Sequence, residues 1–138
     1  MKKILLCFIF VIFCSIFSYS QKIASVTELI NQKKYSQAIE ILKLQLSENP
    51  NSVELNLTLG LLYLEIKDYN SAEIYLTKTT YIDQNCLSAH YSLAMIYEKT
   101  KKYNSALSEW NIVLSISSDK SLQEIAKKHI DYIQQQTK

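Results

Sequence analysis

A repeat of 34 residues constrains this chain more than any other feature of its sequence. Tyr-Asn-Ser-Ala occurs at Tyr69–Ala72 and again at Tyr103–Ala106. One interval earlier, Tyr35 and Ala38 stand in register with the same two positions. A fixed period of this length is typical of stacked-repeat architectures, in which each repeat is one supersecondary unit that needs its neighbours to cover its apolar face.

The composition favours helices for these units. Gly and Pro occur once each in 138 residues, whereas a β-sandwich or a loop-built active site uses more of both at its turns. The stretch VELNLTLGLLYL at 53–64 conflicts with this, because it nearly alternates apolar and polar residues like a strand. Its counterpart one period later, LSAHYSLAMIYE at 87–98, does not alternate. Two copies of one repeat should share a structure, so we predict a helix for both and an all-α fold.

The repeated positions resemble those of the tetratricopeptide repeat family. They are Asn56, Leu59, Gly60, Tyr63, Ala72, Leu76 and Gln84 in the second block, His90, Leu93, Ala94, Tyr97, Ala106, Trp110 and Ser118 in the third, and Lys22, Ser25, Val26, Leu29, Ala38, Leu42 and Pro50 in the first. The first block matches well only through its second helix and Pro50. The resemblance covers roughly residues 22–120 and implies a short α-solenoid of three helix-turn-helix repeats, at about 19–52, 53–86 and 87–120.

The sequence after the third repeat predicts a C-terminal capping helix at 121–138. Its apolar residues recur at helical spacing, at Leu122, Ile125, Ala126, His129, Ile130 and Ile133. Repeat arrays need a terminal cap with a polar outer face. The first repeat has no such cap, which would leave an apolar end for a partner.

The first twenty residues predict a secretory signal peptide. Lys2 and Lys3 precede an apolar run of about 14 residues, and Ser18 and Ser20 stand before Gln21, so we expect cleavage after Ser20. A membrane-spanning helix needs about 20 apolar residues. An uncleaved membrane anchor and a lipidated Cys14 remain alternatives. Cleavage would make this an exported protein of the periplasm or cell envelope, without a membrane span.

The remaining residues give little support to nucleic-acid binding or to catalysis. Residues 1–20 contain two of the fifteen lysines and no acidic residue, which leaves thirteen basic against thirteen acidic residues and no arginine. There is no Gly-rich phosphate loop and no nucleophile elbow, and His90 and His129 have no Cys or carboxylate at zinc-ligand spacing. Cys86 would be the only thiol left, and we expect it to pack as a small apolar residue. We therefore expect no catalytic residue, no cofactor, no metal and no nucleic-acid partner.

The resemblance also implies a concave groove lined by the first helices of successive repeats. The groove positions would be Ile23, Thr27, Ile30, Leu57, Leu61, Leu64, Tyr91, Met95 and Glu98. The Lys, Arg and Asn clamp with which some family members hold a carboxylate is absent, because Ile23, Thr27, Thr58, Ser88 and Ser92 stand there instead. The sequence thus predicts an interaction module that binds a hydrophobic or amphipathic segment of a protein or peptide partner. The alternatives are an obligate structural subunit of a bacterial cell-envelope complex, and a groove covered by the helix at 121–136 or by self-association.

Overall fold

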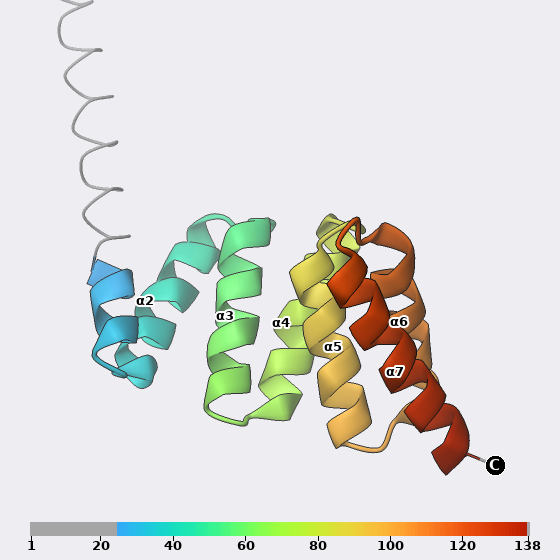
Figure 1. Ribbon diagram of the computed structural model, residues 1–138. Coiled ribbons are helices and arrows are strands. Elements are labelled where there is room, and N and C mark those ends of the chain that lie inside the picture. Colours follow the sequence, from blue (N-terminus) through green and yellow to red (C-terminus); the bar gives the residue numbers. More distant parts are fainter. Residues whose placement is uncertain (1–24, 138) are drawn as a thin grey trace, which may run out of the picture. The chain divides into compact units, whose positions relative to one another are not determined.

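A computed structural model describes residues 25–137 of the chain, and these residues form helices joined by short turns (Figure 1). A helical stretch at 25–31 precedes α2 (Tyr35–Glu48), α3 (Val53–Glu65), α4 (Tyr69–Ile82), α5 (Leu87–Lys99), α6 (Tyr103–Ile116) and α7 (Lys120–Gln136). Within 25–137 there is no strand, which confirms the all-α prediction. The ambiguous stretch at 53–64 lies within α3 and is helical. The predicted signal peptide and Ile23 lie outside the described residues.

The chain divides into two compact units, of which the first ends at Leu44 and the second is Gln45–Lys138. In the first unit, Val26 on the helix at 25–31 and Ala38, Ile39 and Leu42 on α2 are buried. In the second unit, α3 packs on α4, α4 on α5, α5 on α6 and α6 on α7, so each helix contacts the next along the chain (Figure 1). None of the helices within 25–137 has both the length and the apolar character that crossing a membrane requires.

Each helix pair closes through the same turn, and a lysine takes the same unusual backbone conformation in all three. Lys33, Lys67 and Lys101 have φ angles of 57°, 61° and 59°. In the second of these turns the amide of Lys67 donates to the carbonyl of Leu64, and the amide of Asp68 donates to the carbonyl of Tyr63. This is the Schellman arrangement, which satisfies carbonyls at a helix C-terminus. The 34-residue period therefore extends to the backbone, and it includes the first block.

Small residues allow the paired helices to approach closely. Ala38, Ala72 and Ala106 are all fully buried at equivalent places. Gly60 on α3 faces Leu76 on α4 so closely that a β-carbon at Gly60 would lie 2.6 Å from Cγ of Leu76. The helix pair α3–α4 therefore depends on the absence of a side chain at position 60.

The last helix completes the core of the third repeat. Ala126 and Ile133 of α7 are fully buried, and they lie in one cluster with Trp110 and Val113 of α6. Their spacing of two helical turns puts both on one face of α7. The opposite face of α7 is exposed, with residues such as Lys127 and Lys128, as a terminal cap requires.

Candidate binding surface

Three helices of the second unit border an open, apolar hollow on the surface. Its volume is about 470 Å³, and it is lined by Leu61 of α3, by Leu87, Ser88, Tyr91 and Ser92 of α5, and by Leu122 of α7. Leu87, Tyr91 and Leu122 pack with one side against the core of the third repeat, so the wall of the hollow is anchored. Leu61 is still 39% exposed. The hollow can therefore take up a large apolar side chain, whose burial would stabilise a complex by about 2 kcal/mol.

A second hollow lies toward the C-terminal end of α5. It has a volume of about 260 Å³ and is lined by Met95, Glu98, Lys99, Lys101, Tyr103 and Tyr132. A smaller one of about 220 Å³ shares Glu98 and Tyr132 with it and adds Lys128 and His129. We call the two together the cationic hollow. The cationic hollow has lysines in its lining, whereas the apolar hollow has none. Helices α5 and α7 contribute residues to both hollows.

The carboxylate of Glu98 is already engaged within the cationic hollow. Its Oε2 atom accepts a hydrogen bond from Nε1 of Trp110 at 3.2 Å and lies 2.8 Å from Nδ1 of His129. The rings of His129 and Trp110 stack with their centroids 4.4 Å apart. These contacts join α5, α6 and α7, and they hold the capping helix in place.

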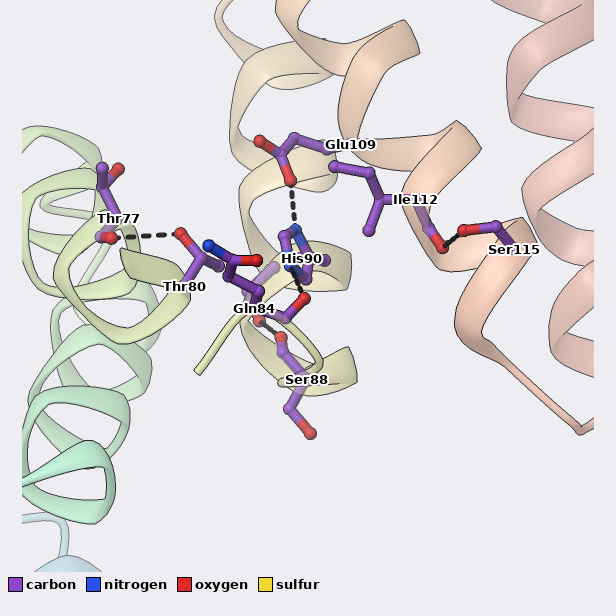
Figure 2. A network of polar contacts seen from close by, with 9 residues as sticks. Thr77, Thr80, Gln84, Ser88, His90, Glu109, Ile112 and Ser115 are labelled. Carbon is purple, nitrogen blue, oxygen red and sulfur yellow. Dashed lines mark hydrogen bonds and ion pairs between the residues drawn. The ribbon is translucent and has the colours of Figure 1, made fainter. Parts of the chain in front are cut away.

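His90 of α5 forms a second polar link, to Glu109 of α6 (Figure 2). Its Nδ1 atom is 2.6 Å from Oε2 of Glu109, and its Nε2 atom is 3.0 Å from the carbonyl oxygen of Gln84. The His90 ring is buried, and both of its nitrogens are within hydrogen-bond distance of an oxygen. His90 thus packs between α5 and α6. Since neither nitrogen faces a nucleophile, the pair has the geometry of a structural link between α5 and α6.

An ion pair at the junction of the second and third repeats lies beside Tyr97, whose pKa is raised. The ammonium of Lys102 lies 2.7 Å from Oε2 of Glu73 and 5.4 Å from the ring centroid of Tyr97. Burial, together with the negative charge of Glu73, raises the pKa of the Tyr97 hydroxyl above its usual value of 10.0. The neutral form of Tyr97 is thus the one that the folded state favours.

Comparison with known families decides the classification. A tetratricopeptide repeat model matches residues 29–96, and a second tetratricopeptide repeat model matches residues 87–111. Together they extend over more than half of the chain and include the three repeated turns at Lys33, Lys67 and Lys101. The chain belongs to the tetratricopeptide repeat family. Its fold class and the resemblance seen in its sequence are therefore confirmed.

Solved structures agree with this tetratricopeptide repeat fold. The type III secretion chaperone SycD of Yersinia enterocolitica, in complex with a peptide of the translocator YopD, matches with a TM-score of 0.79 and 13% identity over 88% of this chain and 95% of that chain. PcrH, in complex with the chaperone-binding region of PopD, matches with a TM-score of 0.77 and 14% identity over 88% and 94%.

A third solved structure gives a similar picture. The first repeat domain of Spaghetti (RPAP3), bound to an HSP90 peptide, matches with a TM-score of 0.72 and 17% identity over 83% of this chain and 88% of that chain. At these identities the likeness shows the fold alone. No curated protein matches the sequence.

The predicted groove residues do not all line one hollow in the structure. Leu61 and Tyr91 line the apolar hollow, and Met95 and Glu98 line the cationic hollow. Leu57 and Leu64 are half-buried on α3 and line neither hollow. Thr27 is exposed and Ile30 half-buried on the helix at 25–31, in the first unit.

Two lining residues were missed as groove residues by the sequence prediction. Leu87 lies one turn before Tyr91 on α5, so extending the predicted groove by one helical turn would have found it. Ser88 and Ser92 were named only as the residues that stand in place of the carboxylate clamp, and both line the apolar hollow. Leu122 was predicted only as part of the capping helix, but it forms a wall of the apolar hollow. The capping helix thus lines this part of the surface, and Leu61 remains accessible beside it.

In the described part of the chain, no three His, Cys, Asp or Glu side chains are grouped so that they could hold a metal ion. Cys86 is a free, half-buried thiol directly before α5. Trp110 is fully buried. Asn56, the first residue of a glycosylation sequence, is also buried, and its amide donates to the carbonyls of Pro50 and Ser52.

Proposed function

We propose that this protein is an interaction module that binds an apolar or amphipathic segment of another protein in the apolar hollow. The observation that carries the proposal is the hollow itself, whose described lining is mostly apolar and consists of three leucines, Tyr91 and two serines. Exposed apolar surface on a stable wall is a feature of sites that another molecule covers. Related folds support the proposal, since SycD and PcrH are seen with segments of YopD and PopD.

We also propose that the protein is exported and acts in the cell envelope. The support is the order of Lys2 and Lys3, the apolar run and the small residues before Gln21. The intact mass of the protein recovered from the envelope fraction tests this proposal, because a chain that begins at Gln21 differs from the full chain by the whole leader. A retained leader on a membrane-bound protein would favour the anchor, and a lipid adduct on Cys14 would favour a lipoprotein.

Two groove variants test the binding proposal. Leu61→Asp and Tyr91→Asp each introduce a charge into the wall of the apolar hollow, and they should abolish the capture of envelope proteins by the immobilised protein. Leu44→Asp is the matched control, because Leu44 is 62% exposed on α2 and lines neither hollow. Far-ultraviolet circular dichroism should show unchanged helix content in all three variants. Capture that persists in both groove variants would refute the proposal.

A second candidate function is that of an obligate structural subunit, and one observation favours it. Ile74 and Tyr81 on α4 are 67% and 78% exposed and lie two turns apart on one helix face. The repeat places Ser108 and Ser115 at the equivalent positions of α6, where they are also exposed. The double variant Ile74→Ser and Tyr81→Ser gives α4 the pattern of α6. If that variant loses its complex while Tyr91→Asp keeps it, the structural-subunit function is correct.

A further inference from the structure

The two hollows differ in charge although the same two helices contribute to both. Tyr91 in the apolar hollow is followed along α5 by Met95 and then Lys99 in the cationic hollow, each one turn further on. These two turns span about 12 Å, which is roughly four residues of an extended segment or eight of a helical one. A single bound segment can therefore reach both hollows.

The cationic hollow has unbalanced positive charge. Lys99, Lys101 and Lys128 are exposed, and none of them forms an ion pair within residues 25–137. The one acidic group of this hollow, Glu98, already has His129 and Trp110 as partners. A partner that brings carboxylates to the lysines would meet little competition from the protein's own acidic side chains.

We propose that the partner segment has two parts, with large apolar side chains that enter the apolar hollow and acidic side chains that pair with Lys99, Lys101 and Lys128. This inference rests on the proposed function and adds the chemical class of the partner. The lysines supply point charges on long, flexible stems, so they select for negative charge and do not require a terminal carboxylate in one fixed geometry. Charge complementarity of this kind contributes more to partner choice and association rate than to total affinity.

Two synthetic peptides of about fifteen residues test the inference. They are added to the unaltered protein, which is isolated in the form that its own cells contain. Both peptides have the same leucine- and phenylalanine-rich half. The second half carries three glutamates in one peptide and three glutamines in the other. Fluorescence anisotropy should show about tenfold tighter binding of the glutamate peptide at low ionic strength, since each exposed ion pair contributes modestly. High salt should remove this advantage, because it screens exposed charges.

Protein variants show where the selectivity resides. The triple variant Lys99→Gln, Lys101→Gln and Lys128→Gln should bind both peptides with the affinity that the unaltered protein has for the glutamine peptide. The matched control removes three lysines that line neither hollow, Lys43, Lys78 and Lys127, and should keep the preference. Tyr91→Asp should weaken the binding of both peptides.

The outcomes separate this inference from the proposed function. Equal binding of the two peptides that is lost in Tyr91→Asp supports the proposed function and overturns the inference. Failure of both peptides to bind overturns both. A glutamate preference that survives in the triple variant places the charge selectivity elsewhere and also overturns the inference. Sedimentation of the protein alone tests the remaining occupant, because self-association abolished by Tyr91→Asp would mean that a second copy covers the hollow.

Discussion

Replacing Gly60 with alanine brings two opposing effects together at one buried position. Gly60 lies inside α3, where alanine is favoured over glycine by up to about 1 kcal/mol through helix propensity. The new β-carbon, however, would lie 2.6 Å from Cγ and 2.8 Å from Cδ2 of Leu76, and 3.3 Å from its amide nitrogen. Leu76 is fully buried, so it has little room to move. Overpacking of this kind costs about 1–3 kcal/mol.

The packing cost should exceed the gain in propensity, so Gly60→Ala should lower the free energy of unfolding by about 1 kcal/mol. The sign should reverse once Leu76 is shortened. Leu76→Ala alone should cost about 2–5 kcal/mol through lost burial and a cavity. In that background Gly60→Ala should be stabilising, because the clash is gone and the added methyl group fills part of the cavity.

Urea unfolding followed by circular dichroism measures all four members of this cycle. The next repeat supplies a matched control, since Ala94 occupies the position of Gly60 and is fully buried. Ala94→Gly should therefore destabilise the protein by about 1 kcal/mol. The reasoning is refuted if Gly60→Ala raises the free energy of unfolding of the unaltered protein. It is also refuted if the effects of Gly60→Ala and Leu76→Ala are additive, because the contact between the two positions would then contribute nothing to stability.

Three further predictions follow from single positions. Ala106→Leu should cost at least about 2 kcal/mol in urea unfolding because Ala106 is fully buried between paired helices, and a cost below about 0.5 kcal/mol would contradict that packing. Lys67→Gly should raise the free energy of unfolding by about 0.5–1 kcal/mol, since Lys67 has a φ of 61° that glycine adopts without strain; a loss of stability would show that the lysine side chain matters more. The raised pKa of Tyr97 means that the folded state holds this proton more tightly than the unfolded state, so its contribution to stability is complete below the usual value of 10.0 and is lost as pH rises through the folded pKa. Unfolding measured from pH 8 to 11 should show a smaller alkaline loss of stability in Tyr97→Phe, and an identical loss would contradict this reason.

Much of the fold was predictable because the same residue types recur every 34 positions along the sequence. The recurrence of Tyr and Ala at the same interval, together with the scarcity of Gly and Pro, was enough to predict helix pairs and to place Ala38, Ala72 and Ala106 at equivalent positions of the repeat. Even the strand-like stretch at 53–64 was resolved correctly, because its counterpart in the next repeat broke the alternation. The common left-handed turn was not predicted, because lysine is not a residue that ordinarily indicates that conformation.

The lining of the two hollows was predictable only in part. The resemblance to the tetratricopeptide repeat family implied groove positions at Leu61, Tyr91 and Met95, and each of these lines one of the hollows. The register alone gave no reason to separate Leu57 and Leu64 from them, because small rotations of a helix decide which of its residues face a hollow and which are half-buried beside it.

The sequence by itself determined the period, the helices and the small residues that let helices pair, because these depend on residues three, four or thirty-four positions apart. Only the tertiary structure decided which side chains meet between helices. Glu98 and His129 are 31 residues apart, and His90 and Glu109 are 19 apart, so neither pair follows the repeat. The same is true of Leu122, which becomes a wall of the apolar hollow because α7 packs as the next helix of the array. Such contacts depend on how each helix is rotated and offset against its neighbour, and a one-dimensional pattern does not specify that geometry.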